Sequence, residues 1–166
     1  MPESALAPRS PSAEADVVIL GGGPAGLSAA LNLGRSRTRV VVVDAGRPRN
    51  AATLRSHGFL TRDGVSPLEL RKLARAELTA YPEVSVVERT SASALIPMDT
   101  SNGMRFIVAL SGRAPGTPPA IAARSVLVAT GLREELPAIP SLRAFYGMSM
   151  FSSHASHAAQ LKMLIP

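Results

Sequence analysis

Residues 16–26 read DVVILGGGPAG, a short apolar run that leads into three consecutive glycines. An apolar run of this length after one acidic residue is expected for a strand buried on both faces of a parallel sheet. Pro24 is tolerated in the first turn of a helix, and the small and apolar residues up to about Gly34 favour that helix. Residues 39–44 then form a second candidate strand with four successive valines. The pattern predicts a βαβ unit.

The loop of this unit satisfies the spacing G-x-G-x-x-G. Gly21 allows a tight turn, Gly23 lets the backbone approach a pyrophosphate, and Gly26 permits close packing of helix against strand. Free amides and the positive end of the helix favour phosphate groups there. Asp44 ends the second strand and is placed to accept hydrogen bonds from a ribose diol, which makes NADP a poor fit. The alternative interpretation is a flexible turn beside a solvated strand end.

Two stretches beyond the loop add to this interpretation. Residues 45–50 include Arg49 and Asn50, which can reach a phosphate or a ring carbonyl, although a solvated basic loop explains them equally well. Residues 126–131 form a late strand that ends in Ala129, Thr130 and Gly131. A simple NAD-dependent Rossmann enzyme leaves that turn unexplained, whereas two-dinucleotide flavoproteins place such a turn over the cofactor.

The rest of the chain predicts one more helix and several strands. Residues 66–69 read as a capping box that opens a helix running to about Thr79. Residues 84–87 are a candidate third parallel strand, and short antiparallel strands are expected near 92–96 and 105–110, with a turn at 102–103. Residues 111–119 hold three prolines and two glycines and predict an exposed loop before a strand at 125–129.

Composition limits the classes of function. The 166 residues are 46% apolar, which predicts one packed core. From the motifs and local patterns we expect a loose leader at 1–15, a Rossmann-type domain at 16–140 and an irregular or weakly helical tail at 141–166. No apolar run reaches the roughly 18 residues of a membrane span, so we expect a cytoplasmic protein with no membrane partner. The net charge is +6, but dense Lys/Arg blocks and interleaved aromatics are missing, so we expect no nucleic-acid partner.

The chain contains no cysteine, which excludes disulfides, thiolate metal sites and dithiol redox centres. We expect no metal site, because His154 and His157 have no nearby carboxylate and give too few ligands for zinc. Packing or surface exposure explains both histidines adequately.

With these motifs in place, residues 15–151 resemble the thioredoxin-reductase-like flavoproteins, and most closely their branch of dithiol oxidases and bacterial thioredoxin-reductase-type oxidoreductases. The resemblance is carried by residues 16–26, 44–50, 57–64 (HGFLTRDG) and 129–137 (ATGLREELP). It implies an α/β, Rossmann-type FAD-binding domain with a parallel sheet and a small antiparallel β-meander. It also implies that this domain is incomplete at its C-terminus, because family chains return to it with a last strand.

The resemblance implies FAD bound noncovalently, with its pyrophosphate at Gly23 to Gly26 and its adenosine ribose on Asp44. The adenine would lie near Thr90. The side chains of Arg49, Asn50 and His57 would line the path toward the isoalloxazine. The binding residues so implied are Gly21, Gly23, Pro24, Ala25, Gly26, Asp44, Ala45, Gly46, Arg49, Asn50, His57, Thr90, Ala129, Thr130 and Gly131.

In this family NADPH reduces the flavin from a separate inserted domain, and the flavin exchanges electrons with a C-x-x-C pair. That pair aligns with Ser153 and Ser156, and serine forms neither a disulfide nor a charge-transfer thiolate. His157 follows where the relatives have an acid-base helper. The family's dithiol reaction is therefore excluded for this chain alone, and no catalytic side chain is assigned.

We expect an FAD-dependent oxidoreductase in a truncated or split form. NADPH would be its electron donor only where a partner supplies the NADPH domain, and a homodimer or a second chain would complete the sheet. One alternative is a dinucleotide-binding protein without turnover, or a degenerate fragment. Another is an NAD-only Rossmann enzyme.

Overall fold

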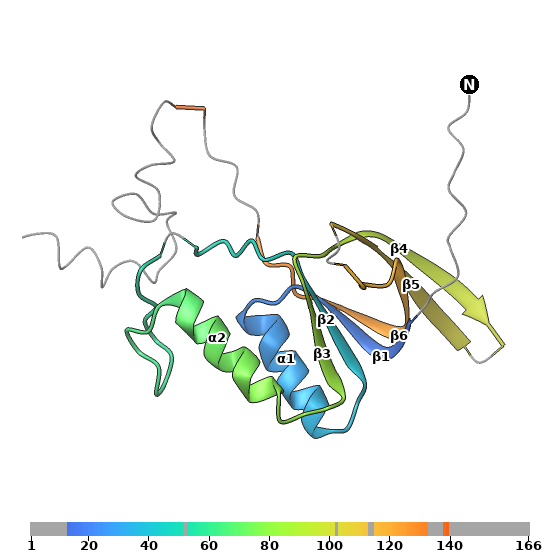
Figure 1. Cartoon of the computed structure of the whole chain (residues 1–166), viewed down its shortest axis with the longest axis horizontal. Coiled ribbons are helices and arrows are strands. Elements are labelled where there is room, and N and C mark those ends of the chain that lie inside the picture. Colours follow the sequence, from blue (N-terminus) through green and yellow to red (C-terminus); the bar gives the residue numbers. More distant parts are fainter. Residues whose placement is uncertain (1–12, 52, 102, 113–114, 133–137, 140–166) are drawn as a thin grey trace, which may run out of the picture. The chain divides into compact units, whose positions relative to one another are not determined.

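The computed structural model describes residues 13–51, 53–101, 103–112, 115–132 and 138–139. The chain forms, in order, β1 (Ala13–Leu20), α1 (Pro24–Arg35), β2 (Val40–Asp44), α2 (Pro67–Leu78), β3 (Val84–Glu88), β4 (Ser91–Thr100), β5 (Gly103–Ser111) and β6 (Ala120–Val128) (Figure 1). The expected tail at 141–166, with its serines and histidines at 153–157, lies outside the described residues, as does most of the expected leader.

One six-stranded sheet runs through the fold in the order β3-β2-β1-β6-β5-β4. Strands β3, β2, β1 and β6 run parallel to one another. Strands β6, β5 and β4 form an antiparallel meander. Because β6 belongs to both arrangements, the meander is continuous with the parallel sheet. The predicted α/β, Rossmann-type class is confirmed.

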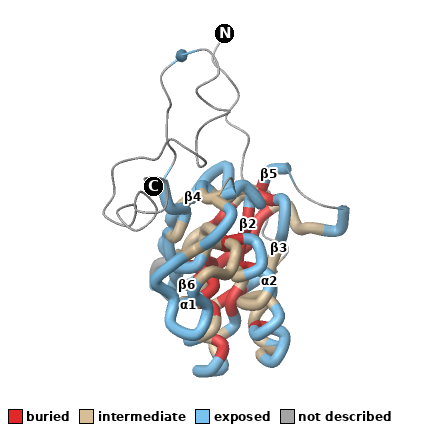
Figure 2. Tube along the Cα trace, turned by 90° about the vertical axis from the view of Figure 1, so that its left-hand side faces the viewer, coloured by how far each residue is buried: buried red, intermediate tan, exposed pale blue. Residues whose placement is uncertain are grey.

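Apolar residues cover both faces of the parallel strands. On one face, Ile19 and Val42 pack with Leu27 of α1 and with Leu78 at the end of α2. On the other face, a second cluster joins Val18 and Val43 of β1 and β2 to Val108, Leu110 and Ile121 of the meander. Figure 2 shows the buried residues concentrated along the strands. This two-sided burial explains why the first two strands read as uninterrupted apolar runs.

Several strand boundaries differ from the sequence-based prediction, including that of β4, which runs to Thr100 and not only to about residue 96. The strand predicted at 125–129 begins five residues earlier, at Ala120, and its first four residues are buried. Alanine has a low strand propensity, so AIAAR did not read as a strand. Its residues are held there by pairing with Phe106–Ala109 of β5 and with β1. Likewise, β1 begins at Ala13, three residues inside the expected leader.

The chain divides into two compact units. The first contains the sheet, α1 and the part of α2 from Leu73 onward, in residues up to 47 and from 73 to 131. The second contains residues 48–72, where a loop is closed by backbone hydrogen bonds between Ser56 and Val65 (2.8 Å) and between Gly64 and Ser56 (2.8 Å). Neither described helix is long and apolar enough to span a bilayer.

Candidate dinucleotide-binding site

The glycine loop between β1 and α1 passes directly against the turn that follows β6. Gly21 has a φ of +115°, and an added Cβ would lie 2.3 Å from the carbonyl oxygen of Ala129. The amide of Ala129 in turn donates to the carbonyl of Leu20 at 2.8 Å. Only a residue without a side chain fits this backbone conformation and this contact.

Gly26 is needed for a different contact. A Cβ there would lie 1.9 Å from the carbonyl oxygen of Gly21 and 3.3 Å from Cγ2 of Ile19. The first turn of α1 therefore packs backbone against backbone on the end of β1.

Gly23 has no such internal constraint. It is the N-cap of α1 with φ −82° and ψ −178°, an extended conformation that any residue adopts. An added Cβ would meet nothing within 4 Å in the part of the chain that the structure describes. No described side chain caps this helix terminus, and its first turn holds no acidic residue. The terminus therefore presents amide groups and a positive dipole end beside open space.

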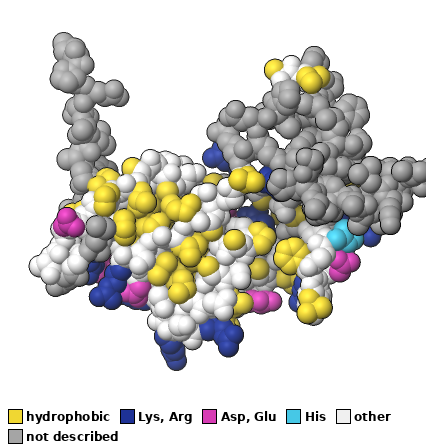
Figure 3. Space-filling view, turned by 180° about the vertical axis from the view of Figure 1, so that it is seen from behind, with side chains coloured by type: hydrophobic (Ala, Val, Ile, Leu, Met, Phe, Trp, Pro, Cys, Tyr) yellow, Lys and Arg dark blue, Asp and Glu magenta, His cyan; other side chains and the backbone are white. Residues whose placement is uncertain are grey.

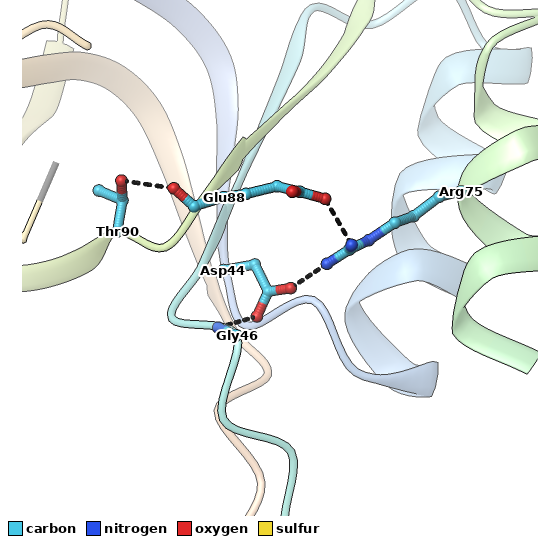
Figure 4. A network of polar contacts seen from close by, with 5 residues as sticks. All are labelled: Asp44, Gly46, Arg75, Glu88 and Thr90. Atoms are coloured by element: carbon cyan, nitrogen blue, oxygen red, sulfur yellow. Dashed lines mark hydrogen bonds and ion pairs between the residues drawn. The ribbon is translucent and has the colours of Figure 1, made fainter. Parts of the chain in front are cut away.

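Asp44 lies next to the loop, at the carboxyl end of β2, and is only 5% exposed. Its Oδ1 accepts a hydrogen bond from the amide of Gly46 at 2.9 Å, and its Oδ2 pairs with the guanidinium of Arg75 (Figure 4). A Cβ on Gly22 would lie 2.6 Å from Cγ and Oδ2 of Asp44. The carboxylate therefore lies directly against the glycine loop.

Thr90 lies beside Asp44 and is fully buried. Its amide donates to the carbonyl of Asp44 at 3.0 Å, and its hydroxyl donates to the carbonyl of Glu88 at 2.9 Å. The side chain of Thr90 thus stabilises the bend between β3 and β4, and its hydroxyl already has a partner.

Most of the residues implied by the sequence lie in the first compact unit, around the carboxyl ends of β1, β2 and β6. They are Gly21, Gly23, Pro24, Ala25, Gly26, Asp44, Ala45, Gly46, Thr90, Ala129, Thr130 and Gly131. Arg49, Asn50 and His57 belong to the second unit.

In the second unit, the carboxylate of Asp63 holds His57 in place. Its Oδ2 lies 3.2 Å from Nδ1 of His57, and its Oδ1 accepts from the amide of Gly58 at 2.8 Å. The Gly58 hydrogen bond first, and then the imidazole, lower the pKa of Asp63 below its usual value of 3.8. Among the residues that the structure describes, the other ring nitrogen, Nε2, makes no hydrogen bond.

Sequence reasoning missed Gly22, Arg75 and Glu88. A signal for two of them exists: β2 and β3 both end in an acidic residue, and parallel neighbours in register bring two such carboxylates together. The structure pairs Asp44 with Glu88 in this way. Two adjacent carboxylates repel each other, and a cation between them favours their ionised forms; here Arg75 is such a cation. Nothing in the local sequence of α2 indicates that Arg75 is this cation.

The comparisons with known proteins agree with this geometry. Residues 15–163 match the pyridine nucleotide-disulphide oxidoreductase family. The chain is 31% identical over 144 residues to a probable thioredoxin reductase of Arthroderma benhamiae, an alignment that covers 87% of this chain and 35% of the relative.

Two solved structures are similar over most of this chain. HlmI matches with a TM-score of 0.77 and 40% identity, covering 87% of this chain and 43% of HlmI. The putative thioredoxin reductase TrxB from Bacillus anthracis matches with a TM-score of 0.69 and 37% identity, covering 82% of this chain and 43% of TrxB. The chain thus spans less than half the length of these relatives. It belongs to the pyridine nucleotide-disulphide oxidoreductase family, as a thioredoxin-reductase-like member without cysteines.

Proposed function

We propose that this chain binds FAD noncovalently and forms the FAD-binding part of a thioredoxin-reductase-like oxidoreductase. The observation that carries the proposal is Gly23. Gly21 and Gly26 are explained by contacts within the chain, whereas a side chain at Gly23 would meet neither steric conflict nor backbone strain among the described residues. A pyrophosphate lying against the N-terminus of α1 accounts for this glycine.

The surrounding residues fit an adenine dinucleotide. The amides and the dipole of α1 favour the two phosphates. The Asp44 carboxylate accepts from the amide of Gly46 and pairs with Arg75, and we assign the ribose hydroxyls to the same carboxylate. The buried backbone at Thr90 and the turn from Ala129 to Gly131 would border the adenine and the pyrophosphate. We assign Pro24, Ala25, Ala45 and Gly46 to the same surface.

Arg49, Asn50 and His57 are proposed to contact the flavin half of the cofactor. Within their own unit, Asp63 fixes the orientation of the His57 imidazole. FAD would supply the hydride and electron transfer, and the protein would supply its position and electrostatic surroundings.

Reduction by NADPH needs a second nucleotide-binding domain. The chain spans 35–43% of the relatives described above, so we propose that a further segment or a partner chain supplies that domain. The electron acceptor is not a dithiol of this chain, because the chain has no cysteine.

The test of FAD binding compares two valine variants of α1. Gly23→Val fills the space where the pyrophosphate would lie, and Ser28→Val places the same side chain on an exposed position of the same helix. We expect the wild type and Ser28→Val to bind FAD in titration calorimetry and to show the visible absorption of oxidised flavin. Gly23→Val should bind at least about tenfold more weakly, a difference of about 1.4 kcal/mol. Equal affinities in all three proteins would remove the main support for the site.

The absence of cysteine favours a second candidate function, dinucleotide binding without turnover. NADPH distinguishes the two candidates when it is added to the flavin-loaded protein together with whatever chain co-purifies with it. Bleaching of the flavin absorption supports the oxidoreductase, and a stable yellow protein supports the binding protein.

A further inference from the structure

The two ring nitrogens of His57 have different surroundings. Nδ1 lies 3.2 Å from Oδ2 of Asp63, whereas Nε2 makes no hydrogen bond among the residues that the structure describes. The His57 side chain is 39% exposed, so the ring is only partly covered. In a neutral imidazole one nitrogen donates a hydrogen bond and the other accepts one. What Nε2 can bind therefore depends on which nitrogen carries the proton.

The carboxylate of Asp63 determines where that proton lies. Its Oδ1 accepts from the amide of Gly58 at 2.8 Å, and this hydrogen bond, followed by the imidazole, lowers the pKa of Asp63 below 3.8. Asp63 is thus ionised near neutral pH, and an ionised carboxylate has no proton to donate. The hydrogen in the contact between Nδ1 and Oδ2 therefore belongs to Nδ1, and Nε2 of the neutral ring carries a lone pair.

The loop that contains both residues has a defined backbone. The amide of Ser56 donates to the carbonyl of Val65, and the amide of Gly64 donates to the carbonyl of Ser56, each at 2.8 Å. Thr61, between them, has a φ of +68°, which a β-branched residue rarely adopts. Such strain persists only where the surrounding contacts fix the chain, and it is concentrated at ligand-binding sites. The loop is therefore suited to present His57 in one orientation.

We propose that Asp63 is a positioning residue that makes Nε2 of His57 a hydrogen-bond acceptor for the flavin half of FAD. The groups on that half that can donate to a lone pair are the ribityl hydroxyls and the imide N3–H of the oxidised ring. The inference rests on the proposed function, which assigns His57 to the flavin, and adds the residue that selects the kind of atom His57 binds. If Asp63 only closed the loop, its effect on FAD would not depend on the His57 ring.

The tautomer is measured by ¹⁵N NMR of the histidine rings in the ligand-free full chain, at a pH where the rings are neutral. His57→Gln identifies the signals of His57. In the wild type, Nδ1 should carry the proton. In Asp63→Asn the side-chain oxygen should stay on the Gly58 amide, so that the NH₂ group faces Nδ1 and the ring proton moves to Nε2. A wild-type ring protonated on Nε2, or a tautomer that Asp63→Asn leaves unchanged, would overturn the proposal.

Titration of the full chain with FAD and with ADP, which lacks the flavin half, connects the tautomer to the cofactor. Asp63→Asn should bind FAD roughly tenfold more weakly than the wild type, because two donors then face each other, while its affinity for ADP stays unchanged. The unchanged ADP affinity also shows that the variant is folded. Glu69→Gln removes the same charge from another exposed side chain of the same unit, and this matched control should leave both affinities as they are.

The dependence on His57 is tested in a His57→Ala background, where Asp63→Asn should have no further effect on FAD affinity. FAD methylated at N3 then identifies the donor. Weaker binding of the methylated cofactor than of FAD by the wild type, but not by His57→Ala, supports the assignment with the imide as donor. Equal binding of the two cofactors by the wild type, together with the loss in Asp63→Asn, supports it with a ribityl hydroxyl as donor.

The outcomes separate this inference from the function on which it rests. Failure of the wild type to bind both FAD and ADP overturns the proposed function and this assignment with it. FAD binding that Asp63→Asn leaves unchanged overturns the role of Asp63 alone, as does an equal loss of affinity for FAD and ADP. A loss that is confined to FAD and requires His57 supports the positioning role.

Discussion

A single carboxylate organises the loop of the second unit. Asp63 binds the amide of Gly58 and the imidazole of His57, and backbone hydrogen bonds between Ser56 and Val65 close the base of the loop. Because Asp63 is exposed, its charge is screened by solvent and contributes little to global stability. Its local effect is to fix the orientation of the His57 ring through the contact with Nδ1.

The pH dependence of this loop follows from the pKa of Asp63. That pKa is lowered in the folded chain, first by the Gly58 amide and then by His57. The contact is therefore fully present above the usual value of 3.8 and is lost as the pH falls through the lowered pKa. We expect the NMR shift of the Gly58 amide proton to titrate with a midpoint below 3.8, and to lose this titration in Asp63→Asn. A midpoint at or above 3.8 would show that the contact does not form.

At the scale of elements, the glycines between β1 and α1 have two different roles. Some are required by contacts within the chain, and one is proposed to face the ligand. Gly26 brings the helix within backbone contact of the loop, whereas Gly23 is the N-cap with extended dihedrals and open space outside it. Glycine is a weaker N-cap than serine, whose hydroxyl bonds the first-turn amides. The chain thus forgoes a stabilising cap at the place where the pyrophosphate is proposed to bind.

A matched pair of serine substitutions tests this joint. Gly26→Ser puts a Cβ 1.9 Å from a carbonyl oxygen and should lower the free energy of unfolding by about 1–3 kcal/mol, as overpacking does. Gly23→Ser should leave it unchanged or raise it by a few tenths of a kcal/mol, because serine caps the helix. Urea denaturation of the ligand-free chain measures both. A loss of stability in Gly23→Ser as large as that in Gly26→Ser would mean that the space at Gly23 is not open.

At the scale of the whole molecule, the sheet exposes apolar side chains on β6 and on its edge strand β4. Residues 121–123 of β6 pair with both β5 and β1, whereas from residue 124 onward β6 pairs with β1 alone among the described strands. Leu127 and Val128 are 38% and 67% exposed there, and Leu95 and Met98 of β4 are also exposed. Figure 3 shows hydrophobic side chains gathered on the face seen from behind. Half-paired apolar strands of this kind bind other strands or surfaces.

Self-association of the isolated chain should therefore depend on β6. We expect the sedimentation coefficient to rise with protein concentration, and Val128→Lys to reduce that rise because a charge disfavours pairing at this edge. Thr100→Lys, at the exposed end of β4, adds the same charge and serves as the control. Equal association in both lysine variants would show that β6 is not the contact.

The βαβ unit, the glycine loop and the later meander are all predictable from local patterns. Apolar runs, capping signals and turn residues act within a few positions of one another, so α1, β2 and α2 fall close to their predicted bounds. The predicted start of β6 at residue 125 was wrong, because the strand begins at Ala120. The alanines there form a strand only where β5 and β1 bury them. The strand propensity of these residues is weak, so pairing with strands distant in the sequence determines where β6 begins.

In the proposed site, too, some features can be predicted from the sequence and others cannot. The spacing of Gly21, Gly23 and Gly26 and the acidic end of β2 can be read in the sequence, because each reflects a local turn or strand end. The contact of Gly22 with Asp44 and the pairing of Asp44 with Arg75 cannot be read there, since the partners are 22 and 31 positions apart in the chain. Such pairs form only when parallel strands bring their carboxyl ends together and a helix returns beside them. The tertiary structure alone determines which cation lies next to the buried carboxylate.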